Sequence, residues 1–223
     1  DSCILILHDW SSFISLEGPE IDKERGVILE EKRTRNDAQQ RMWEKMLPEI
    51  YPNSPYGHSM PIGLEEVITG FDHEALRAYY HKWYRPDLQG IIIIGDIDVN
   101  EVENHLKTIF EDIPAPVNPA ERTRFEVADN EEPIVSICTD REETNYNISV
   151  YYKHDVVPNE EKNDIQYWLK GYIDQLVATM YNNRLEELTQ KANPPFIFGY
   201  GYYGSFFVSD TKDAWTSMAY AKD

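Results

Sequence analysis

Cysteines and long apolar runs are scarce in this sequence of 223 residues. The two cysteines, Cys3 and Cys138, stand apart with no CxxC spacing, so the sequence predicts neither a zinc knuckle nor a disulfide framework. Apolar runs such as Ile91–Ile94 are far too short to cross a bilayer. We therefore expect a soluble chain, with export to the cell envelope left open because any targeting signal would lie upstream of Asp1.

Positive charge is scarce as well. Lys and Arg number 21 against 40 Asp and Glu, which gives a formal net charge of -19. The electrostatic field of such a negative chain repels the phosphates of nucleic acids and anionic membrane surfaces, whereas it attracts cations and basic peptides. A hydrophobic share of 41% with 13% aromatic residues is enough for a packed core, so we do not expect a disordered acidic tail.

Helix and strand patterns follow one another without strict alternation, which indicates an α+β fold. Apolar periodicity predicts helices at 20–47, 72–83, 98–110 and 159–190. Runs rich in β-branched or alternating residues predict strands at 88–95, 125–127, 134–139, 146–152, 196–208 and 214–221. The proline-rich segment 114–121 predicts a linker, which divides the chain into one part at 1–113 and another at 122–223.

The stretch 20–47 carries the least usual pattern. Pro19 suits a first helical turn and Pro48 a stop, so we expect one long helix between them. At 100° per residue, one narrow stripe of this helix contains Ile21, Glu24, Ile28, Glu31, Arg35, Ala38, Met42 and Met46. Two carboxylates on a stripe that should face the core need a partner or a metal. The alternative is that Glu31 pairs with Arg35 one turn on, while Glu24 lies at a solvated edge.

The sequence lacks local motifs for a histidine zinc site or a phosphate-binding loop. No two of the six histidines stand three to five residues apart, so no single helix offers a pair that could clasp zinc. His58 fits a hydrogen-bonding loop residue, and His73 and His81 fit surface or aromatic-packing positions. The tract Gly199–Gly204 superficially resembles a phosphate loop, but its alternating tyrosines predict a strand instead.

Short motifs of another kind follow one another along most of the chain. They are Glu24-Arg-Gly-Val-Ile-Leu-Glu-Glu31, Tyr51-Pro-Asn-Ser-Pro-Tyr-Gly57, Pro61-Ile-Gly63, Trp83-Tyr-Arg-Pro86, Ile91-Ile-Ile-Ile-Gly95-Asp96 and Asn183-Arg-Leu185. In this order they resemble the M16 family of zinc metallopeptidases, the group of pitrilysin, insulin-degrading enzyme and mitochondrial processing peptidase. Each motif has low specificity by itself, and the resemblance rests on the order in which all of them occur.

The resemblance implies a mixed, mostly antiparallel sheet with helices packed on it, in two partial homologous domains. It also implies a zinc-dependent endopeptidase that cleaves unfolded peptides in a chamber, with a second M16 half or subunit as a further partner. The family's inverted motif, His-x-x-Glu-His, supplies two zinc ligands and the general base, and a later glutamate is the third ligand. Carried over to this sequence, Glu31 is the expected Zn2+ ligand and Glu24 a supporting carboxylate of the catalytic site.

One departure from the family pattern is large, because His-x-x-Glu-His occurs nowhere in these 223 residues. We expect the motif upstream of residue 1, so that the chain taken alone is inactive. Two alternatives stay open. One is a catalytically dead M16 homologue that binds peptides or a partner subunit, and the other is an acidic interaction domain with Glu24 and Glu31 in salt bridges.

Overall fold

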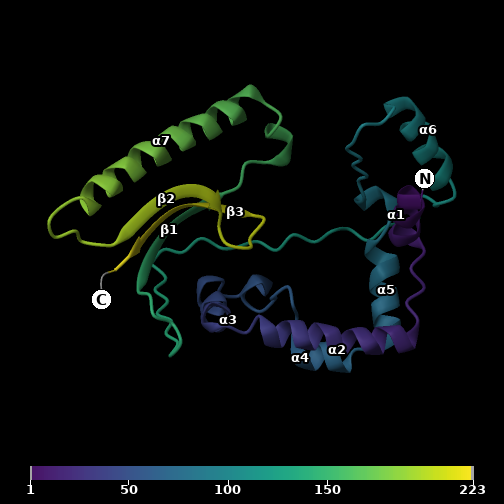
Figure 1. The fold of residues 1–223 in the computed structure, drawn as a ribbon, viewed down its shortest axis with the longest axis horizontal. Helices are drawn as coiled ribbons and strands as arrows, with labels where there is room; N and C mark the ends of the chain where they lie inside the picture. Colours follow the sequence, from purple (N-terminus) through teal and green to yellow (C-terminus); the bar gives the residue numbers. More distant parts are fainter. Residues whose placement is uncertain (1, 222–223) are drawn as a thin grey trace. The chain divides into compact units, whose positions relative to one another are not determined.

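The computed structural model describes residues 2–221. The chain forms two compact units, whose elements are drawn in Figure 1. The first, which we call the helical unit, comprises residues 1–34 and 62–122. The second, which we call the sheet unit, comprises residues 35–61 and 123–223.

The described part of the helical unit contains helices joined by irregular chain. Its elements are α1 (Ser2–Ser12), α2 (Gly18–Thr34), α4 (Glu65–Gly70), α5 (His73–Trp83), the 3-10 turn η2 (Pro86–Leu88) and α6 (Val99–Phe110). Aspartates begin two of these helices, since the Asp72 carboxylate accepts a hydrogen bond from the Ala75 amide at 2.7 Å and Asp98 caps α6 in the same way. The helices predicted at 72–83 and 98–110 are confirmed, whereas no sequence signal predicts α1 or α4.

The sheet unit is built on three antiparallel strands in the order β1-β3-β2. Its elements are α3 (Ala38–Ile50), η1 (Pro55–Gly57), β1 (Asn147–Asp155), η3 (Asn159–Glu161), α7 (Ile165–Thr189), β2 (Phe198–Ser205) and β3 (Lys212–Tyr220). Figure 1 shows α7 lying along one face of the sheet. The helix predicted at 159–190 and the three strands predicted from residue 146 onward are confirmed, with small shifts at their ends.

Glycine in β2 allows α7 to lie close to the sheet. A Cβ atom on Gly201 would come within 2.8 Å of the rings of Tyr181 and Trp215, so a larger residue would push the helix away. The Asn182 side chain of α7 fixes the same contact, because it accepts from the Gly201 amide at 2.7 Å and donates to its carbonyl at 3.1 Å. The tyrosine-rich tract is therefore a strand, as its alternation predicts.

The largest buried cluster lies against the other face of the sheet. It consists of Leu47, Tyr51, Val127, Phe206 and Ala214. The Tyr51 hydroxyl donates to the Phe206 carbonyl and accepts from the Val208 amide at 3.2 Å, so the buried phenol has both kinds of partner. This cluster joins α3 to β3 and to the segment before β1.

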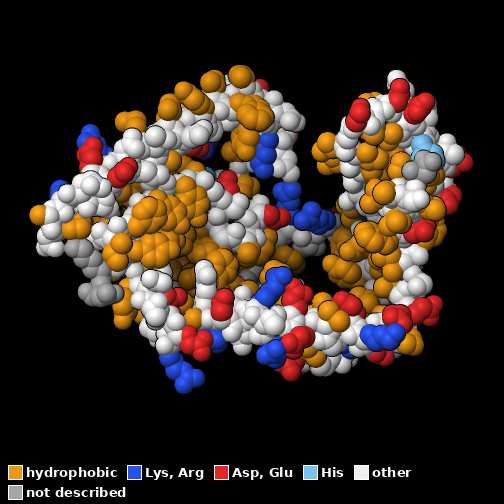
Figure 2. Space-filling view, in the orientation of Figure 1, with side chains coloured by type: hydrophobic (Ala, Val, Ile, Leu, Met, Phe, Trp, Pro, Cys, Tyr) orange, Lys and Arg blue, Asp and Glu red, His pale blue; other side chains and the backbone are white. Residues whose placement is uncertain are grey.

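The side of α7 that faces away from the sheet is apolar and open. Its exposed side chains include Trp168, Tyr172, Leu176 and Met180, and Figure 2 shows hydrophobic side chains along this helix and over the sheet. A helix that is apolar all round is typical of a buried position. Within the part of the chain that the structure describes, this side of α7 has no cover.

The prediction of one helix over 20–47 is wrong. Helix α2 ends at Thr34 and α3 begins at Ala38, with Asp37 as its N-cap. The Asp37 carboxylate accepts from the Gln40 amide at 2.8 Å, and this local bond starts a new helix where continuation was expected. Pro48 lies inside α3 rather than at its end. The predicted stripe is therefore divided between two helices, and only its first four residues lie on α2.

The strands predicted at 88–95, 125–127 and 134–139 are also wrong. The structure describes these segments as irregular chain or, at Pro86–Leu88, as a 3-10 turn. Ile94 is 91% exposed and Ile137 is 83% exposed, so the burial expected at 88–95 and 134–139 is missing there, whereas Val127 is buried. β-branched composition favours a strand only where a neighbouring strand completes the ladder. Among residues 2–221 no such neighbour pairs with these runs.

Candidate functional site

Helix α2 is held against the C-terminal end of α4 by one arginine. The Arg25 guanidinium donates to the Ile68 carbonyl and, at 2.6 Å, to the Phe71 carbonyl. Its central carbon also lies 3.8 Å from the centre of the Phe71 ring, which is the geometry of a cation–π contact. These carbonyls belong to the last turn of α4, where no further turn of helix satisfies them. Arg25 therefore supplies the missing donors.

A second tether lies two turns further along α2. The Lys32 ammonium donates to the Gly63 carbonyl at 2.8 Å, in a turn where Gly63 has φ +83°. Ile21, the one buried residue of α2, lies on the same side of the helix as Arg25 and Lys32. These three residues set the side of α2 that faces α4.

The two candidate carboxylates lie about a quarter turn round the helix from that side. Glu24 is exposed, Glu31 is half-buried, and the neighbouring Glu30 is exposed. The expectation that the whole stripe faces a core is therefore wrong, because on α2 only Ile21 is buried. Arg35, the alternative partner of Glu31, lies just beyond the end of α2.

Glu24 and Glu31 are aligned but not adjacent. Seven residues of helix place them about 20° apart around the axis and about 10.5 Å apart along it. Ligand oxygens bind zinc at roughly 2.0–2.2 Å, so two side chains that leave the helix in parallel from this separation do not share one ion. The spacing therefore does not allow both carboxylates to bind the same metal ion.

Other charged residues of α2 are engaged in surface pairs. Arg33 donates to both carboxylate oxygens of Glu30, at 2.8 and 2.5 Å, and this hydrogen bonding lowers the pKa of Glu30. Asp22 accepts from His73 at 2.8 Å and from Arg25 at 3.1 Å, and both bonds lower its pKa. Glu30 and Asp22 thus serve the helix surface and its packing.

The described residues do not form a complete zinc site. Among residues 2–221, no group of three or more His, Cys, Asp or Glu side chains is placed to hold a metal ion. A catalytic zinc normally takes three protein ligands and a water. The half-buried carboxylate of Glu31 fits one of these ligands, on a side of α2 that α4 leaves free.

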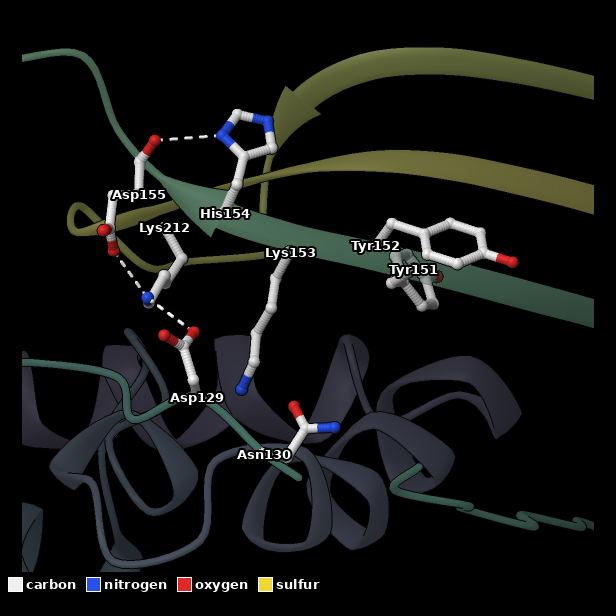
Figure 3. A pocket seen from close by; sticks show the side chains of 8 residues that line it. All are labelled: Asp129, Asn130, Tyr151, Tyr152, Lys153, His154, Asp155 and Lys212. Atoms are coloured by element: carbon white, nitrogen blue, oxygen red, sulfur yellow. Dashed lines mark hydrogen bonds and ion pairs between the residues drawn. The ribbon is translucent and has the colours of Figure 1, made fainter. Parts of the chain in front are cut away.

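A hollow of about 500 Å³ lies in the sheet unit and is drawn in Figure 3. Its centre is the buried Lys212, whose ammonium contacts Asp129 at 2.7 Å and Asp155 at 2.5 Å. Burial alone would lower the pKa of Lys212, but the hydrogen bonds to the two carboxylates raise it. Two lysines and two aspartates line the hollow, so their charges cancel. The arrangement ties the start of β3 to the end of β1 and to the chain before β1, and we interpret it as structural.

Sequence reasoning identified neither Arg25 nor the Lys212 cluster. Arg25 follows Glu24 directly, but its acceptors are backbone carbonyls more than forty residues away, which leave no trace in composition. The two partners of Lys212, Asp129 and Asp155, come from two separate segments of the chain. No helix among the described residues is long and apolar enough to cross a membrane.

Comparison with known sequences gives consistent matches. The profile of the family described as "Peptidase M16 inactive domain" matches residues 70–168. The "Zinc protease PQQL-like" of Arabidopsis thaliana is 30% identical over 198 residues, which are 86% of this chain and 20% of that protein. The "Probable zinc protease PqqL" of Escherichia coli K12 is 30% identical over 195 residues, which are 87% of this chain and 20% of that protein.

Comparison with solved structures agrees. The crystal structure of the first half of the periplasmic protease PqqL from Escherichia coli superposes with a TM-score of 0.80 at 25% identity, over 100% of this chain and 46% of that one. The crystal structure of pitrilysin has a TM-score of 0.68 at 17% identity, over 100% of this chain and 24% of that one, and it supports the fold alone. The chain spans about one fifth of the length of the curated relatives it matches.

Proposed function

Because this chain belongs to the M16 family of zinc metallopeptidases, we propose that the complete protein is a zinc-dependent metalloendopeptidase. The observation that carries the proposal is helix α2, where Glu31 is half-buried and in line with Glu24 on a side that α4 does not cover. The relatives that share most of this chain are named zinc proteases. A carboxylate oxygen is among the ligands that zinc accepts in proteins.

The proposed roles of the two glutamates follow from their placement. Glu31 would hold zinc through its carboxylate, together with the two histidines of the family's His-x-x-Glu-His motif. Bound zinc lowers the pKa of a water molecule and polarises the scissile carbonyl. Glu24 lies too far along the helix to share the ion, so we assign it the supporting role, as a hydrogen-bond acceptor that orients a neighbouring ligand.

The substrate and partners are proposed at the level of chemical class. The complete protein would take unfolded peptides, enclosed in a chamber to which a second M16 half or subunit contributes. One relative with a solved structure is described as a periplasmic protease, and we propose export to the cell envelope here also. We further propose that the segment 114–121 joins the end of one family domain, at 1–113, to the start of the next, at 122–223.

A catalytically inactive M16 homologue is the second candidate. It is favoured by the matching profile, which is described as an inactive domain. Such a protein would bind peptides or an active sibling without cleaving anything. An acidic interaction domain is the third candidate, and it would need no zinc at all.

One experiment separates the three candidates. The complete protein, expressed from its full gene, is assayed on fluorogenic peptides before and after treatment with a zinc chelator, and again after zinc or magnesium is returned. A peptidase loses cleavage on chelation and regains it with zinc but not with magnesium. Peptide binding without cleavage would favour the inactive homologue. An absence of both cleavage and zinc-dependent stabilisation would leave the interaction domain.

A further inference from the structure

Arg25 makes more contacts than a surface arginine on an exposed helix needs. Its side chain is only 15% exposed, and it touches the Ile68 carbonyl, the Phe71 carbonyl, the Phe71 ring and the Asp22 carboxylate. Because these four contacts lie in different directions, together they hold the guanidinium of Arg25 in one position. Arg33, on the same helix, is 72% exposed and bonds Glu30 across one turn.

The chemistry of the guanidinium suits this position. It is planar and always charged, and it carries five N–H donors in a rigid fork. The acceptors are main-chain carbonyls at the end of α4, so a cation there also meets the negative end of that helix. Lysine, a point charge on a flexible stem, would reproduce the charge but not the fork or the stacking on Phe71.

The position of Arg25 determines how α2 is rotated. It follows Glu24 by one residue and precedes Glu31 by six, so a fixed direction at Arg25 fixes the direction of both carboxylates. A carboxylate lies about 6 Å from the helix axis, and a rotation of about 20° would therefore move it by about 2 Å. Metal–ligand distances tolerate only about 0.2 Å. Lys32 holds the same side with a single bond to Gly63.

We propose that Arg25 is a positioning residue, which sets the rotation of α2 against α4 and so aims the Glu31 carboxylate at the zinc ion. The inference rests on the proposed function of Glu31 as a zinc ligand. Arg25 touches neither metal nor substrate in this role. It acts through the helix that carries the ligand.

The test compares variants of the complete protein in two measurements. Zinc affinity of the folded protein is measured by competition with a chromophoric chelator, and the visible absorption of the cobalt-substituted protein reports the geometry of the ligands. We expect Arg25→Ala to weaken zinc binding by about 10–100-fold, in the range known for residues that orient ligands, and to alter the cobalt bands. Arg25→Lys should recover part of the loss. Arg33→Gln, the matched control, should change neither measurement.

Further variants keep the test decisive if Arg25→Ala does not fold. Phe71→Leu keeps both carbonyl acceptors and removes only the ring, so we expect a smaller loss of zinc affinity with the same direction of change in the cobalt bands. Wild-type zinc affinity and cobalt spectra in Arg25→Lys and Phe71→Leu, with only a lower melting temperature, would overturn the proposal. Glu31→Gln separates this failure from that of the proposed function. If Glu31→Gln loses zinc while the Arg25 and Phe71 variants retain it, only the positioning role fails, whereas full zinc in Glu31→Gln refutes the ligand assignment itself.

Discussion

The interactions that stabilise the sheet unit internally differ in kind from those that stabilise the helical unit internally. In the sheet unit, Leu47, Tyr51 and Ala214 belong to one connected cluster of buried residues. In the helical unit, the buried apolar residues are Ile4, Ile21, Ile68 and Tyr80, and side chains also bond to the backbone of other segments. Arg25 reaches the end of α4, Arg77 donates to the Leu16 carbonyl, and the Tyr80 hydroxyl donates to the Trp10 carbonyl.

Apolar burial and directional hydrogen bonds contribute differently, the first to the free energy of folding and the second to the orientation of one segment against another. Burial of apolar area is non-directional and contributes most of the free energy of folding. A hydrogen bond from a long side chain adds about 0.5–1.5 kcal/mol, but it has a direction and fixes one segment against another. We therefore expect core substitutions in the sheet unit to change stability most, and substitutions of tethers in the helical unit to change geometry and its dependence on pH.

The largest effect on stability should follow from Leu47→Ala. Leu47 is 1% exposed in the cluster beneath the sheet, and removing its side chain leaves a cavity. We expect the free energy of unfolding to fall by about 2–5 kcal/mol, as measured by urea denaturation. Val67→Ala in α4 is the control, because Val67 is 53% exposed, and it should change stability by less than about 0.5 kcal/mol. Equal losses in the two variants would contradict the contrast between the units.

A smaller effect should follow from Tyr51→Phe. The ring stays, but the Phe206 carbonyl and the Val208 amide lose their partner, at a cost of about 1–3 kcal/mol. Burial also raises the pKa of Tyr51 to about 12, so the neutral phenol stabilises the fold. That stabilisation is complete below pH 10 and is lost as the pH rises towards 12. Denaturation between pH 9 and 12 should show this loss in the wild type and a weaker dependence in Tyr51→Phe. An unchanged pH dependence in the variant would refute this account.

The smallest effect should be the pH dependence of the contact between α1 and the end of α6. His8 bonds Asp112 at 2.9 Å and Asp9 at 3.0 Å, and these bonds raise its pKa above the ordinary 6.5, against the effect of burial. The protonated form is the stabilising one, so the contribution is complete below pH 6.5 and is lost as the pH rises through the raised pKa.

Hydrogen exchange of the α1 amides, corrected for the intrinsic rate, should therefore accelerate as the pH rises from about 6 to about 8.5. His8→Gln should remove this dependence, whereas His58→Gln, at an exposed loop position, should leave it unchanged. Because both carboxylates are largely exposed, added salt should reduce the effect. If hydrogen-exchange protection of the α1 amides in the wild type does not change with pH, the proposed effect of the His8 contacts is wrong.

Sequence patterns predicted the elements whose signals are local. Asp72 and Asp98 cap helices within three residues of themselves, and the glycines of β2 mark the strand that lies against α7. The failed strand predictions depend on distant partners. The run Ile91–Ile94 has strand composition, but a strand needs a neighbour to pair with, and composition does not say whether one is present. The break at Asp37 shows instead that a local cap can override a long apolar stripe.

The candidate site was predicted in part. Periodicity placed Glu24 and Glu31 on one side of a helix, and the structure keeps both on α2, with Glu31 half-buried and Glu24 exposed. Full burial is not observed because Ile21, Arg25 and Lys32 set the side of α2 that faces α4, about a quarter turn from both glutamates. The tethers that orient α2 could not be predicted, since Arg25 binds main-chain carbonyls that every residue possesses.

The most direct measurement is a paired comparison of Glu31→Gln and Glu30→Gln in the complete protein, with bound zinc and peptide cleavage as readouts. The two residues are adjacent in sequence but about 100° apart on α2, and Glu30 already pairs with Arg33 at the surface. We expect Glu31→Gln to lose zinc and at least about a hundredfold of activity, beyond the 10–100-fold typical of changes to residues around the ligands. Glu30→Gln should keep both at the wild-type level. Full zinc and activity in Glu31→Gln would contradict the assignment and leave Glu31 as a structural residue of the helix.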